Sequence, residues 1–160
     1  MIRRIEIGDA ESIAPLARTA RTGAIPRLPD LHTPAEDLAF YRSQIESASG
    51  LVWVDEQGLV RAFVMWRDDL VEHLYVDTTR QREGIGTALL ERAVAEMNVP
   101  EVRLWTFQEN ARAVAFYTKH GFRVLEQTDG WGNEEGLPDL LLGRPRVAAA
   151  RVVLLARFHR

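Results

Sequence analysis

The fold of this chain is decided by two neighbouring stretches, Val71-Glu72-His73-Leu74-Tyr75-Val76 and Gln81-Arg82-Glu83-Gly84-Ile85-Gly86-Thr87. The first is a short, largely apolar run that predicts a strand. A helix over 84–97 is predicted by the helical spacing of Ile85, Leu89, Ala93 and Met97. Glycine lets a backbone pass close to a ligand, and the free amides at a helix start attract anions. The stretch 81–87 is therefore either a phosphate-binding loop or an ordinary turn. It matches neither a Walker A loop nor the dinucleotide-binding fingerprint.

Apolar patterning on either side of this unit predicts the remaining elements. We expect seven strands, over 2–7, 51–54, 59–66, 71–76, 102–107, 122–125 and 137–142. Helices are also expected after Asp9 and Thr33 as N-caps, and over 110–120. Thr33, Pro34 and Glu36 form a capping-box pattern. The strand–helix–strand unit requires parallel strands at 71–76 and 102–107. The predicted fold is α/β (α+β): a mixed, mostly antiparallel sheet of about seven strands, flanked by helices on both faces.

The composition is that of one folded domain. The chain has 160 residues, 46% hydrophobic and 27% charged, which excludes a disordered or low-complexity chain. It contains no cysteine, which excludes disulfides, thiolate metal sites and a cysteine nucleophile. No apolar run approaches the roughly 20 residues of a membrane span, and the first residues lack the apolar stretch of a signal peptide. We therefore expect a cytoplasmic protein with no membrane partner.

The net charge of −3 hides an asymmetry. Residues 144–160 contain five arginines and no acidic residue, whereas residues 1–143 contain 23 acidic and 15 basic residues. An acidic body argues against nucleic-acid binding, and the basic segment keeps that alternative open only in a weak form. We expect one domain over 1–143 and a basic C-terminal extension over 144–160. The extension is either part of the same unit or a contact in a homodimer.

A second group of residues follows the expected strand at 102–107: Asn110, Phe116-Tyr117 and Gly121-Phe122. Each has an ordinary structural explanation, as a helix N-cap, packed aromatic residues and a helix stop. Together with the strand and the Gln-x-x-Gly-x-Gly loop described first, however, they resemble the GCN5-related N-acetyltransferase (GNAT) family. The resemblance extends over roughly residues 1 to 143. It implies the GNAT fold, acetyl-coenzyme A (acetyl-CoA) as cosubstrate, and transfer of an acetyl group to a primary amine.

The resemblance also implies how the cosubstrate is held. Backbone groups of 74–76 would pair with the pantetheine arm like an added strand, and an amide there would polarise the thioester carbonyl. Loop amides would cradle the pyrophosphate, helped by the cation of Arg82, which stands where the family often has glycine; the carboxylate of Glu83 would point outward. The implied cofactor-binding residues are Leu74, Tyr75, Val76, Gln81, Arg82, Glu83, Gly84, Ile85, Gly86, Thr87, Asn110, Phe116 and Tyr117.

Two side chains are the candidates for the chemistry. Tyr117 matches the family tyrosine that often protonates the departing thiolate. Glu72 is the first candidate for the general base, because some family members place a carboxylate on this strand. The alternative is a strand glutamate on a solvated face, and His73 is the second candidate base. Strand alternation puts Glu72 and His73 on opposite faces unless a β-bulge intervenes, as it often does in this family.

Two loops are candidates for the amine-acceptor site. The segment 28–33 contributes His32, whose alternative role is a hydrogen bond to a helix start. The segment 128–139 contributes Trp131 and four acidic residues, which either attract a cationic amine or belong to a solvated loop. Their spacing does not match a calcium loop, so no metal is expected. The other three tryptophans are expected in the core: Trp53, Trp66 and Trp105.

The sequence leaves two functions open. One is an acetyl-CoA-dependent N-acetyltransferase that uses direct transfer in a ternary complex, since the absence of cysteine removes one covalent route. The other is a non-catalytic acyl-CoA-binding sensor that keeps the cofactor site and lacks acceptor chemistry. The residues do not name the acceptor or the preferred acyl chain.

Overall fold

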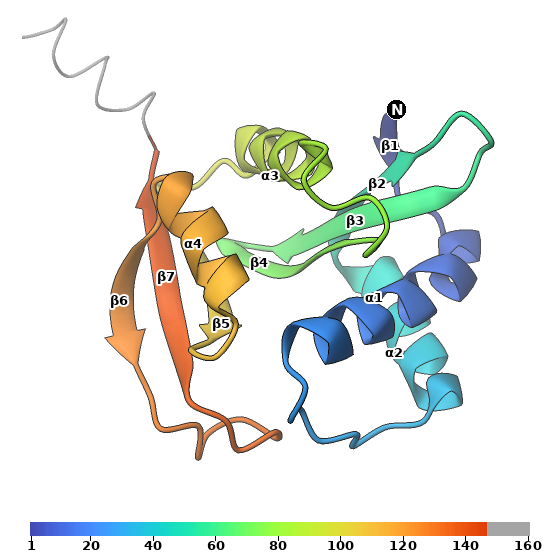
Figure 1. Cartoon of the computed structure of the whole chain (residues 1–160). Coiled ribbons are helices and arrows are strands. Elements are labelled where there is room, and N and C mark those ends of the chain that lie inside the picture. The colour runs from blue at the N-terminus through green and yellow to red at the C-terminus, as the bar shows by residue number, and fades with distance from the viewer. Residues whose placement is uncertain (147–160) are drawn as a thin grey trace, which may run out of the picture.

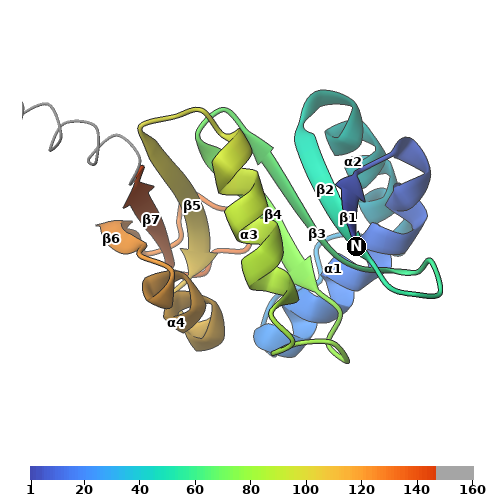
Figure 2. The same ribbon diagram turned by 90° about the horizontal axis from the view of Figure 1, so that it is seen from above.

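The computed structural model describes residues 1–146, which form a seven-stranded sheet with helices on both faces (Figures 1 and 2). The strands lie in the order β1-β2-β3-β4-β5-β7-β6. Their bounds are β1 Ile2–Arg4, β2 Ser49–Val54, β3 Val60–Arg67, β4 Leu70–Val76, β5 Glu101–Phe107, β6 Arg123–Gln127 and β7 Asp139–Pro145. The helices are α1 Ala10–Ala24, α2 Pro34–Ser47, α3 Ile85–Glu96 and α4 Ala111–Lys119, with a 3-10 turn, η1, at Ile7–Asp9. The predicted mixed, mostly antiparallel sheet is confirmed.

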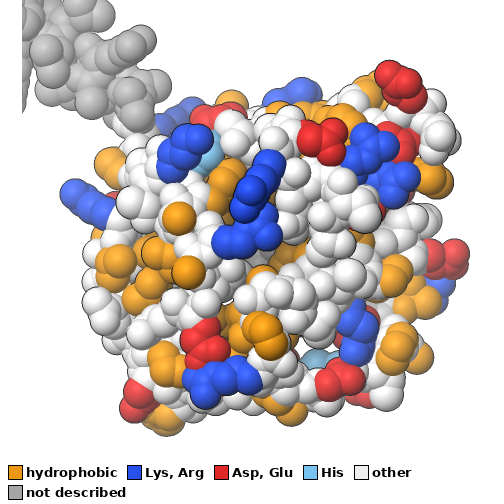
Figure 3. All heavy atoms as spheres, viewed as in Figure 1, with side chains coloured by type: hydrophobic (Ala, Val, Ile, Leu, Met, Phe, Trp, Pro, Cys, Tyr) orange, Lys and Arg blue, Asp and Glu red, His pale blue; other side chains and the backbone are white. Residues whose placement is uncertain are grey.

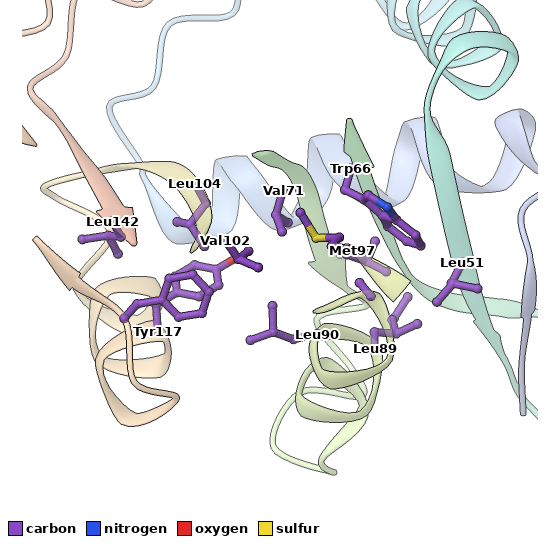
Figure 4. Close-up of a cluster of buried hydrophobic side chains, with 14 of the residues drawn as sticks. Leu51, Trp66, Val71, Leu89, Leu90, Met97, Val102, Leu104, Tyr117 and Leu142 are labelled. Atoms are coloured by element: carbon purple, nitrogen blue, oxygen red, sulfur yellow. The ribbon is translucent and has the colours of Figure 1, made fainter. Parts of the chain in front are cut away.

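Helices α1 and α2 cover one face of the sheet, and α3 and α4 cover the other (Figure 2). Pleating sends neighbouring residues of β3 to opposite faces: Phe63 packs with Ile13 of α1, whereas Val64 belongs to the cluster under α3. That larger cluster includes Leu89 and Leu90 of α3 (Figure 4). Because both faces of β3 are buried, the register of this strand is strongly determined, and the strands beside it are positioned by it.

The sheet divides between its two central strands, β4 and β5. This pair is the one parallel pair among the described strands, as the crossover predicted. It is paired only at Leu70 with Arg103 and at Val71 with Leu104. Beyond these residues the two strands run on to their C-terminal ends without pairing to each other. Backbone groups along the gap are therefore open to a ligand that can pair with a strand edge.

Strand β4 carries a β-bulge at Glu72. His73 lies opposite Met65 and Val71 lies opposite Trp66, so Glu72 is an extra residue without a partner on β3. An extra residue interrupts the alternation of side chains between the two faces of a strand. Glu72 and His73 can therefore face the same region, although they are neighbours on one strand.

The two predicted N-caps have different outcomes. The capping box of α2 is confirmed: the Thr33 hydroxyl accepts the amide hydrogen of Glu36, whose carboxylate accepts the amide hydrogen of Thr33. Asp9 precedes α1 as predicted, but its carboxylate does not cap that helix. It accepts hydrogen bonds from the Arg3 guanidinium and the Glu6 amide instead, because a cation is the stronger partner for a carboxylate. The strand predicted over 2–7 ends at residue 4, where the chain turns toward η1.

Strand β7 continues through Pro145, so Arg144 is part of the sheet. The Arg144 guanidinium donates hydrogen bonds to the Glu91 carboxylate and the His120 carbonyl. The rest of the expected basic extension, residues 147–160, lies outside the described residues, and so does its predicted dimer contact. Within residues 1–146 no helix combines the length and the apolarity needed to cross a membrane.

Candidate active site

A cavity of about 1230 Å³ lies where β4 and β5 separate. Its walls come from β4, β5, α1, the beginning of α3, α4 and the loop between β6 and β7. The predicted site residues that line it are Glu72, His73, Leu74, Tyr75, Val76, Gln81, Arg82, Gly84, Ile85, Gly86, Thr87, Asn110, Phe116, Tyr117 and Trp131. Glu83 and His32 do not line it. The fold thus brings residues from four separate parts of the sequence around one space.

The loop before α3 offers backbone amides to this cavity. Gly84 precedes the helix with a φ of +80°, in the region that favours glycine, and no side chain caps the helix start. The amide of Ala88 donates to the Gly84 carbonyl as the first bond of the helix. The amides of Ile85, Gly86 and Thr87 therefore have no partner within the helix. Amides arranged in this way at a helix N-terminus bind phosphate groups well.

Basic side chains surround the same loop. Arg82 has a φ of +69°, a left-handed conformation that is costly for a residue with a Cβ atom and normal for glycine. Its side chain lines the cavity with those of Arg112 and Lys119. In the space-filling view, basic side chains gather in the middle of this face, between α4 and the β4–α3 loop (Figure 3). Glu83 lies away from the cavity, and its carboxylate is 3.8 Å from the guanidinium of Arg80.

Two side-chain contacts hold the loop in place. Gln81 Nε2 donates a hydrogen bond of 3.3 Å to the carbonyl of Val76 at the end of β4. Thr87 Oγ1 lies 3.1 Å from His120 Nε2, and His120 Nδ1 lies 2.7 Å from the carbonyl oxygen of Phe116. A carbonyl can only accept, so Nδ1 carries the hydrogen of that bond. The contact between Thr87 and His120 ties the start of α3 to α4.

Helix α4 presents Asn110 and Tyr117 to the cavity. The Oδ1 of Asn110 accepts the amide hydrogen of Ala113, so the predicted N-cap is confirmed. Its Nδ2 donates no hydrogen bond to any of residues 1–146 and is free for a ligand. Tyr117 belongs to the buried cluster that includes Val102 and Leu104 of β5 (Figure 4), with only 8% of its surface exposed. Burial, and in smaller part the Tyr75 phenol, raises the pKa of the Tyr117 hydroxyl, which therefore stays protonated at neutral pH.

The bulge on β4 puts Glu72 beside Arg67. Glu72 Oε1 lies 3.5 Å from Arg67 Nε, and the Glu72 side chain is 20% exposed. The Arg67 guanidinium is also held by α2, because its NH2 group donates a 2.8 Å hydrogen bond to Ser47 Oγ. Both Glu72 and His73 line the cavity, as a bulge makes possible.

His73 is an uncharged residue in a predominantly aromatic wall. Its ring meets Tyr41 and Tyr75, with ring centroids 5.2 Å and 6.3 Å away. Burial, with smaller contributions from the charges of Arg21 and Arg67, lowers the pKa of His73 to about 4. A histidine with this pKa is neutral at physiological pH and is a weak proton acceptor.

His32 joins the two loops at the outer edge of the site. His32 Nε2 lies 3.0 Å from Glu134 Oε1, and Nδ1 lies 3.6 Å from Glu36 Oε2. Arg18 holds the same loop through Asp30 and through the carbonyl of His32. The Glu134 hydrogen bond is the main cause that raises the pKa of His32. His32 therefore connects the α1–α2 loop to the β6–β7 loop and does not reach the main cavity.

Two of the four acidic residues in segment 128–139 bond within the segment, and a third, Glu134, contacts His32. Asp139 accepts a hydrogen bond from the Thr128 hydroxyl, and Asp129 accepts the amide hydrogen of Trp131. Trp131 is 87% exposed at the cavity rim. Glu135 lines the cavity and forms no ion pair with another of residues 1–146. The loop thus presents a single unpaired glutamate to the cavity.

Sequence analysis missed several cavity residues, among them Trp105, Arg21, Arg112, Lys119 and His120. Trp105, expected in the core, is 44% exposed and lines the cavity, because β5 has parted from β4 at this level. Arg21 lies in the last turn of α1 and lines the cavity too. A sequence signal for Arg21 exists: it follows Ala14 and Ala17 at the 3- and 4-residue spacing of a buried helix stripe. A charged residue is unusual at a position where this stripe predicts a buried apolar residue.

Comparison with known proteins agrees with this architecture. Residues 48–124 match the family model described as an acetyltransferase (GNAT) domain. Over 78 residues the chain is 35% identical to the uncharacterized protein YxbD of Bacillus subtilis, covering 47% of this chain and 49% of YxbD. Over 104 residues it is 28% identical to the peptidyl-lysine N-acetyltransferase YiaC of Escherichia coli, covering 64% of this chain and 68% of YiaC. The chain thus spans about half the length of YxbD.

Among solved structures, the PaiA N-acetyltransferase of Thermoplasma acidophilum in complex with coenzyme A shares the fold. The TM-score is 0.68 at 20% identity, covering 91% of this chain and 98% of PaiA. The fold of this chain is thus shared with PaiA. Residues 48–124 are in addition similar in sequence to GNAT acetyltransferase domains.

Proposed function

We propose that this protein is an N-acetyltransferase that moves the acetyl group of acetyl-CoA to a primary amine. The carrying observation is the gap between β4 and β5, which has unpartnered amides at its mouth and the Tyr117 side chain on its wall. The names of relatives support this proposal, since YiaC is a peptidyl-lysine N-acetyltransferase and PaiA binds coenzyme A.

The cavity residues fit the chemical groups of coenzyme A. The free edge of β4 at 74–76 suits an extended arm that carries amides, as pantetheine does. The amides of 82–87 suit a pyrophosphate, and the cations of Arg82, Arg112 and Lys119 offset its charge. The free Nδ2 of Asn110 offers one further donor. The cosubstrate supplies an acetyl thioester, which is the activated acyl group for the reaction.

The proposed chemistry needs one proton acceptor and one proton donor. An alkyl ammonium has a pKa of about 10.4, so the amine must lose a proton before its nitrogen attacks the thioester carbonyl. The Glu72 carboxylate accepts that proton, directly or through water. The new N–C bond forms as the C–S bond breaks, and the sulfur leaves as a thiolate. Tyr117 is protonated at neutral pH and donates its hydroxyl proton to that sulfur. The nitrogen loses its second proton as it becomes an amide, and that proton restores the Tyr117 hydroxyl.

Glu72 is the first base candidate and His73 the second. The Glu72 side chain lines the cavity and lies 3.5 Å from Arg67 Nε, and carboxylates serve as general bases. The pKa of His73 is lowered to about 4, so its ring is no stronger a base than a carboxylate, and aromatic rings surround it. We assign His73 to the wall of the acceptor pocket, where its neutral ring contacts the acceptor. Direct transfer in a ternary complex follows, since the thioester and the amine meet in one cavity.

A thiol-release assay with acetyl-CoA and a panel of amines tests the proposal. Released coenzyme A that depends on an added amine, with an acetylated product of matching mass, is the expected result. Initial-rate plots should intersect, and parallel lines would refute direct transfer. The alternative, a non-catalytic acyl-CoA sensor, requires coenzyme A binding by calorimetry without release on any amine. Absence of both binding and release would overturn both functions.

A further inference from the structure

Arg21 lines the acceptor end of the cavity, whereas Arg67 lies beside Glu72, and the partners of the two guanidinium groups differ. Arg67 has the Glu72 carboxylate at 3.5 Å and the Ser47 hydroxyl at 2.8 Å, although its Nε forms no hydrogen bond within the described part of the chain. Arg21 forms no ion pair and donates no side-chain hydrogen bond to any of residues 1–146, and its Nε is a buried nitrogen without an acceptor. Both cations lower the pKa of His73, so both act on the space around this ring.

The surroundings of Arg21 make this lack of a partner costly. Apolar residues of α1 and the segment after it line the cavity beside it, namely Ala20, Ala24, Ile25 and Leu28. Arg21 also lines a small neighbouring pocket with Glu134 and Glu135, but it forms no ion pair with either. A buried donor without an acceptor, and a cation without an anion, both raise the free energy of the folded state. A fixed cation of this kind in a ligand cavity is what a site for an anion requires.

The carboxylates of Glu72 and Glu135 face this region, and neither is paired with Arg21. β4 contributes Glu72, which is taken by Arg67, together with neutral His73 and Tyr75. The β6–β7 loop contributes Glu135, which has no ion pair with Arg21. The acceptor end therefore offers separate carboxylates for an ammonium and a separate guanidinium for an anion.

Resting on the N-acetyltransferase function proposed above, we propose that the acceptor is a small amine that also carries a carboxylate, such as a free amino acid, and that Arg21 binds this carboxylate. The planar guanidinium can donate two parallel hydrogen bonds to the two oxygens of a carboxylate. The amine of the same molecule then lies on the Glu72 side of the cavity. A lysine side chain within a protein brings an ammonium and no anion, and it would leave Arg21 unpaired.

Binding measurements on the full chain test this proposal independently of turnover. The probes are free L-amino acids and the matching L-amino acid amides, titrated by calorimetry with and without saturating coenzyme A. We expect wild-type protein to bind at least one free amino acid about tenfold to a hundredfold more tightly than its amide, since an amide gives the Arg21 guanidinium no anionic partner. Arg21→Gln should abolish this preference, and Arg21→Lys should keep part of it.

Arg42→Gln is the matched control, because it removes a surface cation that pairs with Glu11 outside the cavity. It should leave the preference unchanged. Coenzyme A affinity and the melting temperature should be similar in Arg21→Lys and wild type, which separates acceptor binding from cofactor binding and folding.

Several outcomes would overturn the inference. These are equal binding of acids and amides, no binding of any free amino acid, or an acid preference that survives Arg21→Gln. Acetylation of a blocked lysine peptide at the rate of free amino acids, with no effect of Arg21→Gln, would assign the site to proteins instead. If carboxylate-selective binding is found and no amine is ever acetylated, the anion site stands and the transferase function fails.

Discussion

The carboxylate of Glu72 lies 3.5 Å from the Nε of Arg67, across the bulge that interrupts the pairing of β3 and β4. The two residues are five positions apart in the sequence and come from different strands. The bulge adds Glu72 to β4, and the Glu72 carboxylate pairs with Arg67, the last residue of β3. The same bulge lets Glu72 and His73 line one cavity, so a local irregularity of the sheet builds the acceptor end.

Glu72→Gln tests the proposed base. The amide keeps the size of the side chain but cannot accept the proton, so kcat should fall by about a hundredfold or more at neutral pH. The Kd of acetyl-CoA, measured by calorimetry, should change little. His73→Gln is the comparison, with a smaller loss in kcat expected. A larger loss for His73→Gln than for Glu72→Gln would reverse the assignment.

Tyr117→Phe tests the proposed acid. The ring and its packing against Phe116 and Phe122 remain, and only the hydroxyl is lost. We expect kcat to fall by about a hundredfold while the Kd of acetyl-CoA stays nearly constant. An acetyl thioester with a more acidic leaving thiol should recover part of the lost rate. Unchanged turnover would remove Tyr117 from the acid role.

Arg82→Gly separates the backbone and side-chain contributions of the loop. Glycine relieves the left-handed strain at φ +69° but adds freedom to the unfolded chain, and each effect is about 1 kcal/mol. The free energy of unfolding should therefore change by less than about 1 kcal/mol. Coenzyme A should bind roughly tenfold more weakly, since a charged partner of the phosphates is lost. Unaltered affinity would show that the Arg82 cation does not contact the cofactor.

Gly84→Ala is the complementary change in the same loop. A Cβ at this position meets no atom within 4 Å, so the substitution causes no steric crowding. The φ of +80° disfavours alanine, and we expect a loss of about 1 kcal/mol in the free energy of unfolding by urea denaturation. A stability equal to that of wild type would mean that the loop adopts another conformation at little cost.

The contact between His32 and Glu134 should make stability depend on pH. Glu134 raises the folded-state pKa of His32 above its ordinary value, so protonated His32 is favoured by folding. This contribution is fully present below about pH 6.5 and is lost as the pH rises through the raised pKa. The melting temperature of wild type should therefore exceed that of His32→Gln more at pH 6 than at about pH 9. Glu134→Gln should remove the same pH dependence, whereas a constant difference would show that His32 is neutral in the contact.

Much of the fold followed from local patterns, and the site followed only in part. The capping box at Thr33 and the helical spacing after Gly84 are local, so they predicted helix starts correctly. The Asp9 cap failed because Arg3, six residues away, competes for the carboxylate. Trp105 was placed in the core because an apolar strand residue normally has a neighbouring strand, and here the neighbour departs.

By itself, the sequence determined the order of strands and helices, the parallel crossover and the glycine loop before α3, since each depends on periodicity or on residues close in the chain. The tertiary structure decided where β4 and β5 separate, that Glu72 meets Arg67 at a bulge, and that Arg21 faces the cavity without a partner. The reason is physical. Spacing along a strand or helix specifies which face a side chain occupies, whereas the partners on that face come from distant segments that only folding brings together.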